Sequence, residues 1–294
     1  MAKKIIKINE SRLMDIINRT VNEVVSSRGQ LVEGVQYNKE ENSFIFDFVH
    51  DSERDIIKLT NSGLTKSEIN NKCFYFKYQF EGNVSSQLRA KFIEHMKFHE
   101  GMNKTDIETF VKSAVNSLDD TVNLREYNTV IYPQSISEIN RKVITYIRKF
   151  GYPNFLSFEL VKEPPTELRF DYESYHREIL DATHRIGNRE FPRYSEAQKA
   201  EEERKIKELM KFLKGKDYVS IGRDVSLKYR PYIHNFYKFE NEEQKQVFIK
   251  MNQPKVLIID DVMTSGTTLT HIINTIYKVN PNATVIVFAI LGKS

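Results

Sequence analysis

Residues 256–268 read Val-Leu-Ile-Ile-Asp-Asp-Val-Met-Thr-Ser-Gly-Thr-Thr, and this stretch decides the fold of the second half of the chain. Its first four residues are apolar and mostly β-branched, as in a parallel strand that is covered on both faces. Asp260 and Asp261 stand at the predicted carboxyl end of this strand. Open α/β sheets bind their ligands at that end, and a helix to about Lys278 is expected to follow.

The turn between the strand and the helix is rich in hydroxyl groups, with Thr264, Ser265, Thr267 and Thr268 around Gly266. Its backbone N–H groups and the helix N-terminus favour a phosphate. The two preceding carboxylates would repel a phosphate, so ribose hydroxyls or a divalent cation are expected beside them. A P-loop is excluded because its first glycine and its lysine are absent. The pattern therefore predicts a sugar phosphate, held at two separate points.

Predicted strands and helices alternate from residue 128 onward, which favours a parallel sheet. Residues 166–216 are polar and are expected to form a mostly helical insertion. The other strands of the sheet are expected at 129–132, 155–161, 232–239 and 283–291, with a helix at 138–150 and a short helix or loop at 240–251.

The first 120 residues predict a separate α+β domain. A helix is expected over 9–25, a hairpin over 31–37 and 43–49, a strand over 73–80, and helices over 86–99 and 104–118. The strand at 73–80 is so aromatic that its rings favour a core position over a platform for stacking bases.

Composition limits the class of protein. The 294 residues are 40% hydrophobic, enough for one large or two medium domains with a core. The net charge of +4 is spread along the chain, so nucleic-acid binding is not expected. Cys73 is the only cysteine and no run of eighteen apolar residues occurs. We expect a cytoplasmic protein without disulfides, a signal peptide or a membrane span.

Ile258 to Thr268 resembles the signature of the type I phosphoribosyltransferase family, which is a hydrophobic strand, two acidic residues, two mostly apolar residues and Thr-[Ser/Thr]-Gly-x-[Ser/Thr]. The resemblance implies a Rossmann-like α/β core of parallel strands over residues 121–294, with residues 1–120 as an added α+β domain. It implies transfer of a 5-phosphoribosyl group from phosphoribosyl pyrophosphate (PRPP) to a nitrogenous acceptor such as a nucleobase. Pyrophosphate would be released with the help of Mg²⁺, as in nucleotide salvage.

The resemblance also implies roles for individual residues. Asp260 and Asp261 would hold the ribose hydroxyls, and Thr264, Ser265, Gly266, Thr267 and Thr268 the 5′-phosphate. Gln134 and Ser135, after the first core strand, and Lys162, after the second, would hold the pyrophosphate; Lys162, Asp260 and Asp261 are the candidate catalytic residues. From the residues alone, Ser135 or Ser137 is equally suited to cap the next helix, and Lys162 to be an exposed lysine.

Some features depart from the family pattern. The Gly-rich form of the pyrophosphate loop is absent, and spacing does not identify which arginine between 166 and 230 would close the site. Arg223, Tyr229 and Arg230 are loosely similar to the competence-associated ComF branch, whose cysteine zinc ligands are missing here. The acceptor would be selected by the first 120 residues or by the insertion, and a homodimer fits the family. A non-catalytic regulator that binds PRPP or a nucleotide with the same fold remains the alternative.

Overall fold

The structure is a computed structural model, and it divides the chain into two compact units. It describes residues 34–47, 57–60, 65–69, 72–81, 84–98, 101–134, 137–149, 155–181, 184–186, 189–191, 194–263 and 266–292. The helix expected over 9–25 lies outside this part of the chain. The first unit comprises Met1–Glu126, Ser135–Asn154 and Phe288–Ser294, and the second comprises Tyr127–Gln134 and Phe155–Val287. The units are discontinuous, unlike the predicted division near residue 120.

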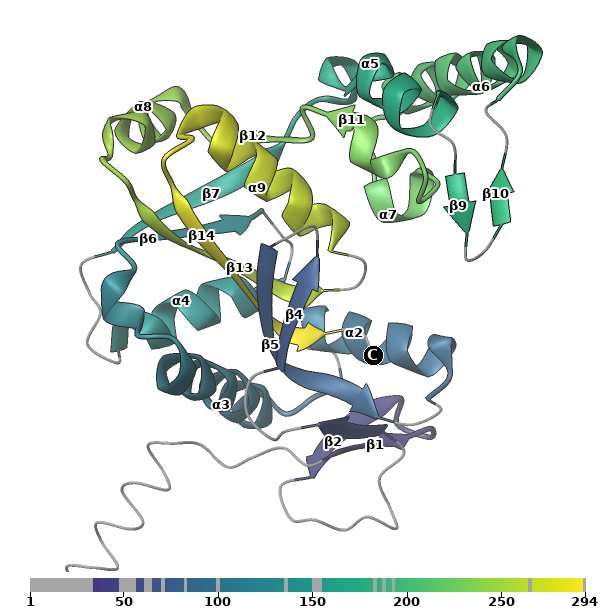
Figure 1. Cartoon of the computed structure of the whole chain (residues 1–294). Helices are drawn as coiled ribbons and strands as arrows, with labels where there is room; N and C mark the ends of the chain where they lie inside the picture. Colours follow the sequence, from purple (N-terminus) through teal and green to yellow (C-terminus); the bar gives the residue numbers. More distant parts are fainter. Residues whose placement is uncertain are drawn as a thin grey trace, which may run out of the picture. The chain divides into compact units, whose positions relative to one another are not determined.

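The second unit is α/β, with a mixed, mostly parallel sheet. Strand β6 (Thr129–Pro133) pairs in parallel with both β7 (Leu156–Lys162) and β13 (Lys255–Met263). The strand order is β12-β7-β6-β13-β14, and β14 (Thr284–Gly292) is divided between the units after Val287. Figure 1 shows β6, β7 and β13 with helix α9 (Thr267–Val279) beside them.

The apolar residues that begin β13 are the centre of this unit. Val256, Leu257, Ile258 and Ile259 are each at most 1% exposed, which confirms that the strand is covered on both faces. Helix α9 buries an apolar stripe at a helical spacing, and helix α8 (Glu242–Lys250) precedes β13. The stripe consists of Leu269, Ile272, Ile273 and Ile276.

The strand predicted at 232–239 is wrong in two respects. It is broken into β11 (Ile233–His234) and β12 (Tyr237–Phe239), because Asn235 between them has a positive φ of 57° that a strand does not accommodate. Strand β12 also runs antiparallel to β7, with Tyr237 opposite Lys162. The sheet is therefore mixed and not purely parallel.

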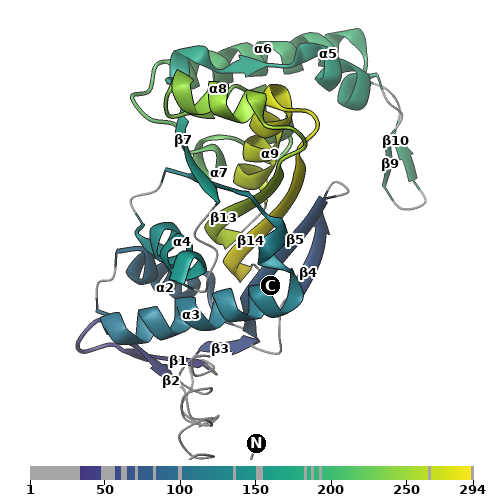
Figure 2. The same cartoon turned by 90° about the vertical axis from the view of Figure 1, so that its left-hand side faces the viewer.

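The predicted polar insertion at 166–216 is largely helical in its described part. Its long helix is α6 (Glu196–Lys214), which lies alongside the short helix α5 (Tyr172–Tyr175) and the π-helix His176–Leu180 (Figure 2). Three short strands also occur, β8 (Arg169–Phe170), β9 (His184–Ile186) and β10 (Arg189–Phe191). Helix α7 (Ile221–Asp224) follows, and β8 pairs with β11.

The first unit contains the predicted hairpin and the predicted aromatic strand. Strands β1 (Gly34–Asn38) and β2 (Ser43–Asp47) pair antiparallel, and the sheet continues through β3 (Ile57–Thr60), β5 (Lys72–Glu81) and β4 (Thr65–Ile69). The sequence analysis missed β3 and β4, which are short. Helices α2 (Ser86–Phe98), α3 (Lys104–Thr121) and α4 (Ile139–Lys149) complete the unit.

The aromatic side chains of β5 are in the core, as predicted. Tyr78 is fully buried and stacks on Phe110 of α3, with ring centres 4.1 Å apart, and Phe80 meets Phe92 of α2 edge-on. Such pairs add to the free energy gained by burial. These described rings hold helices onto the sheet and are not available as a platform for stacking.

Candidate functional site

Two buried aspartates lie near the end of β13. Asp260 is 7% exposed and Asp261 2%, and the backbone N–H of Asp261 donates to Oδ1 of Asp260 at 2.9 Å. The strand was expected to end at these two residues, but it continues through Val262 and Met263. Two carboxylate acceptors therefore stand near the end of this strand.

Gly266 is the described residue between β13 and α9. Gly266 adopts the left-handed conformation, with φ 70° and ψ 0°, and stands at the N-cap of α9. Its carbonyl accepts from the N–H and the hydroxyl of Thr270, at 2.9 and 3.0 Å. The N–H groups of the first helical turn, where Thr267 and Thr268 stand, are not used inside the helix. Thr264 and Ser265 lie outside the described residues.

Tyr237 interacts with Thr268 of α9 and with the acidic pair, and no pattern in the sequence marks it for this position. Its hydroxyl is hydrogen-bonded to that of Thr268, and its pKa is raised by burial first and then by the negative charge of Asp260. Tyr218 and, more weakly, Asp261 contribute to the same shift. A neutral phenol therefore lies within electrostatic reach of both carboxylates.

Lys162 lies on the same side of the sheet, at the end of β7. Its ammonium group donates to the hydroxyl of Tyr218 and to the carbonyl of Val219, the latter at 3.4 Å. It also lies 3.9 Å from the ring centre of Tyr218 and 5.7 Å from that of Phe236. A cavity of about 340 Å³ opens beside these side chains. Lys162 therefore contacts Tyr218, which together with Asp260 raises the pKa of Tyr237.

Gln134 follows β6 at the same level of the sheet. Its N–H donates to the carbonyl of Leu160 at 2.7 Å, and Pro133 pairs with Leu160. On the other side of β6, Ile131 pairs with Ile258, so two residues further along Pro133 stands level with Asp260. The three strand ends therefore bring Gln134, Lys162 and the aspartates to one edge.

The helix-cap interpretation applies to Ser137, whose hydroxyl accepts from the N–H of Ile139 at the start of α4, 3.2 Å away. Ser135 lies outside the described residues, so its predicted contact with pyrophosphate stays a prediction.

Three of the arginines that could close the site contact residues near them in the sequence. Arg177 donates to Ser174 and Glu178, Arg223 lies 3.5 Å from Asp224, and Arg230 donates to the carbonyls of Val225 and Gly222. Arg169 is exposed, and the side chains of Arg185, Arg189 and Arg193 are not described. The structure therefore assigns none of the seven to a leaving group.

The acidic pair fits the coordination chemistry of Mg²⁺, because carboxylate oxygens are ligands that Mg²⁺ prefers, usually together with phosphates of a substrate. Among the described residues, no three His, Cys, Asp or Glu side chains come together as a protein-only metal site requires. Within the described helices, none has both the length and the apolar composition to cross a membrane.

Comparison with known proteins adds no relative: no family model matches the chain, and no curated protein matches its sequence.

Proposed function

We propose that this chain binds PRPP and transfers its phosphoribosyl group to a nitrogenous acceptor, with release of pyrophosphate. The observation that carries the proposal is the end of β13, where two buried aspartates are followed by a left-handed glycine at the N-terminus of α9. The two carboxylates accept from hydroxyls, and the positive N-terminus of α9 attracts phosphate. Only a few residues separate them along the chain. A ribose 5-phosphate has its diol and its phosphate at opposite ends and matches that arrangement.

Each end of the substrate has its own group of residues. Asp260 and Asp261 accept from the ribose hydroxyls, while the N–H groups of the first turn of α9 and the hydroxyls of Thr267 and Thr268 hold the 5′-phosphate. From the sequence pattern, Thr264 and Ser265 take part in the same phosphate cradle. From the family resemblance, Gln134, Ser135 and Lys162 would hold the pyrophosphate.

The reaction breaks the bond between C1 of the ribose and the pyrophosphate oxygen, and a nitrogen of the acceptor forms the new bond to C1. The departing oxygen keeps the electron pair, so the protein must stabilise negative charge there. The ammonium group of Lys162 supplies a positive charge for this. Mg²⁺, bound with PRPP, supplies Lewis acidity at the same oxygens. Binding of the diol by the aspartates fixes the ribose while positive charge develops near C1.

Binding of PRPP is tested by calorimetry in the presence of Mg²⁺. Replacing both Asp260 and Asp261 by Asn is expected to abolish binding, because amides do not replace two buried carboxylates as acceptors and counter-charges. Asp181→Asn, at an exposed aspartate that pairs with Lys199, is the matched control and should bind normally. Thermal unfolding of each variant reports whether it is folded. A folded double variant with unchanged affinity would remove the basis of the proposal.

A second candidate function is a PRPP-binding regulator without turnover. The observation in its favour is that Lys162 and the described arginine contacts are used within the protein, so no further cation is assigned to the leaving group. Release of pyrophosphate from PRPP with a panel of nucleobases and amines separates the two functions. Turnover supports the transferase, whereas saturable binding of PRPP without turnover supports the regulator.

A further inference from the structure

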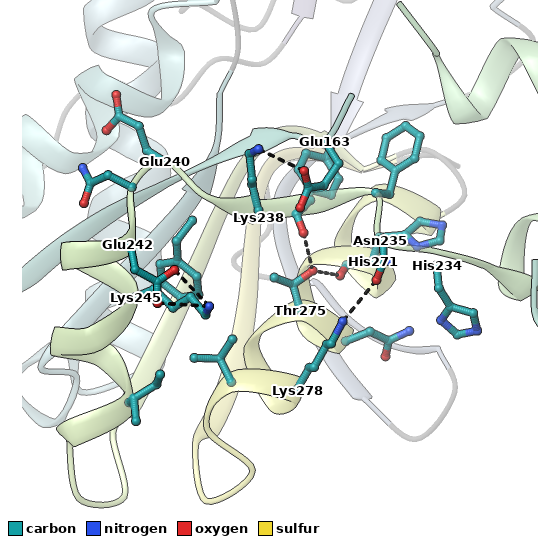
Figure 3. A pocket seen from close by; sticks show the side chains of 17 residues that line it. Glu163, His234, Asn235, Lys238, Glu240, Glu242, Lys245, His271, Thr275 and Lys278 are labelled. Atoms are coloured by element: carbon teal, nitrogen blue, oxygen red, sulfur yellow. Dashed lines mark hydrogen bonds and ion pairs between the residues drawn. The ribbon is translucent and has the colours of Figure 1, made fainter. Parts of the chain in front are cut away.

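A second cavity, of about 730 Å³, lies in the same unit and is not used by the proposed reaction. It is bounded by β12, the residues on both sides of it, α8 and α9, and Figure 3 shows the side chains that line it. Its volume is in the range of roughly 300–1,000 Å³ that is typical of small-molecule sites. Tyr237 is among its lining residues, so the cavity adjoins the candidate PRPP site.

The charges around this cavity cancel. Three glutamates and three lysines line it, and two of the pairs are direct: Lys238 lies 3.0 Å from Glu163, and Lys245 3.0 Å from Glu242. Lys278 donates to the side-chain oxygen of Asn235 at 3.1 Å. Figure 3 shows these contacts along the wall. A balanced wall favours a neutral ligand over a strongly charged one.

His271 of α9 is a buried acceptor in the wall. It is 5% exposed, and its pKa is lowered to about 4, by burial first and then by the charge of His234 when that residue is protonated. The ring is therefore neutral at pH 7. One ring nitrogen is hydrogen-bonded to the backbone of Arg230, while Nε2 has no hydrogen-bond partner among the described residues. With Nδ1 donating its proton to a carbonyl, Nε2 is left as an acceptor.

An enclosed acceptor without a donor costs about 1–3 kcal/mol, which a ligand that donates a hydrogen bond would recover. Aromatic surface lies beside this nitrogen. The ring of Phe236 lies 5.5 Å from that of His271, tilted by 33°, and Tyr237 and Phe239 are also among the residues that line the cavity. Flat apolar surface next to one acceptor and to the amide of Asn274 suits a flat ring that carries an N–H group.

We propose that the cavity between β12, α8 and α9 binds a neutral heterocycle that bears an N–H group, such as a nucleobase, and that this N–H donates to Nε2 of His271. Nε2 is covered by neighbouring atoms, so binding includes a side-chain movement in the wall that exposes it. The site does not depend on PRPP chemistry, and it adds a second ligand to the unit.

The test titrates neutral nucleobases and their nucleosides into the full chain without PRPP. Calorimetry measures binding, and nitrogen NMR of histidine-labelled protein follows Nε2 of His271. We expect saturable binding and an upfield movement of the Nε2 resonance as it accepts the hydrogen bond. Absence of saturable binding by every compound, or binding that leaves the Nε2 resonance in place, overturns the proposal. PRPP binding is measured separately, so that failure of the cavity proposal can be told apart from failure of the proposed function.

Two matched substitutions locate the binding. His271→Phe keeps a ring against Phe236 but removes the acceptor, and affinity should fall about tenfold, the value of one such hydrogen bond. His271→Gln restores an acceptor oxygen and should recover part of the affinity. His176→Phe is the control, because His176 is half-exposed, pairs with Glu203 and does not line the cavity. Equal affinity of the wild type and folded His271→Phe contradicts the proposal; if that variant does not fold, the NMR titration decides.

Discussion

Gly266 sets the backbone conformation at the N-terminus of α9 in the candidate site. Its left-handed conformation costs a side-chain-bearing residue about 1–2 kcal/mol. Gly266→Ala should therefore lower the free energy of unfolding by about 1 kcal/mol and weaken PRPP binding more than tenfold, because the turn that aims the helix N-terminus changes shape.

Gly222 of α7 is the control for this substitution. It has no positive φ, and a Cβ added there would meet no atom within 4 Å. Gly222→Ala should leave PRPP affinity unchanged and keep or slightly raise stability, because alanine restricts the unfolded chain. Urea unfolding and calorimetry check both variants. Equal loss of PRPP affinity in the two would contradict the role given to Gly266.

Glu202 is a buried carboxylate in the insertion. It is 6% exposed and accepts from the hydroxyls of Tyr175 and Tyr229, at 3.1 and 2.9 Å, and from Lys228 at 2.7 Å. Burial alone would raise its pKa, but the hydrogen bonds from Lys228 and Tyr229 outweigh burial and lower it to about 2. The ionised form is therefore the one that the folded insertion requires.

Because the pKa of Glu202 is lower in the folded than in the unfolded chain, its stabilising effect is complete above about pH 4.5 and is lost as the pH falls towards 2. Glu202→Gln should lower the free energy of unfolding by about 2–3 kcal/mol at pH 7. The difference from the wild type should shrink between pH 4.5 and 2.

The control for Glu202 is its neighbour on α6, Glu203, which is 36% exposed and pairs with His176. Glu203→Gln should lower the free energy of unfolding by less than about 1 kcal/mol at pH 7, because exposed ion pairs contribute little to stability. Urea unfolding across this pH range checks both variants. A constant difference between wild type and Glu202→Gln at all pH values would show that Glu202 acts by packing and not by charge.

Prediction from sequence succeeded where neighbouring residues carry the pattern. Asp260, Asp261 and Gly266 are consecutive or nearly so, and the local strand, turn and helix follow from their residue types. Tyr237 is far away in sequence and reaches Thr268 because β12 lies against α9, where the hydroxyl of Thr275 also donates to the carbonyl of Tyr237. No local pattern marks a tyrosine for that role.

At the scale of elements, the sequence placed most of the described strands and helices and failed at their ends and directions. Alternation of strands and helices favours parallel pairing, but it does not show that Asn235 takes a positive φ and interrupts a strand. Nor does an acidic pair in the sequence end a strand when the apolar Val262 and Met263 continue it. Direction and length are set by contacts that a single segment does not contain.

The end of α8 is tied to the end of α9 by one buried side chain. The amide nitrogen of Asn280 donates to the carbonyls of Phe248 and Met251, at 3.0 and 2.9 Å. Asn280→Ala should lower the free energy of unfolding by about 2 kcal/mol, because two buried carbonyls lose their donor.

Asn282, an exposed residue two positions further on, is the control. Asn282→Ala should stay within about 0.5 kcal/mol of the wild type, as surface substitutions generally do. Urea unfolding compares the two variants. If the two substitutions lower the free energy of unfolding equally, the hydrogen bonds of Asn280 do not hold these helices together.

At the scale of the whole molecule, binding of PRPP should slow hydrogen exchange in the second unit and not in the first. All described residues of the candidate site except the cap residue Ser137 belong to the second unit. With Mg²⁺ and PRPP at 100 times the dissociation constant, binding adds about 2.7 kcal/mol to the stability of the state that binds. Hydrogen exchange should therefore slow in β13 and the first turns of α9 but not in α2 or α3. Protection confined to α2 and α3 would place the ligand elsewhere.

The domain division was the least predictable feature. The sequence suggests one boundary near residue 120, because the strand-helix alternation begins there. The structure instead assigns α4 and the last residues of β14 to the first unit. Residue types within α4 and β14 specify a helix and a strand, but not the unit whose core each one completes.

This interleaved order has a consequence for synthesis of the chain. The first unit takes Met1–Glu126 early, Ser135–Asn154 soon after and Phe288–Ser294 later, so it stays incomplete while the 161 residues from 127 to 287 are translated. At about 5–20 residues per second, that interval lasts about 8 to 30 s. During this time the first unit lacks the part of β14 that completes it. Its apolar surface stays exposed, and we expect chaperones to bind it.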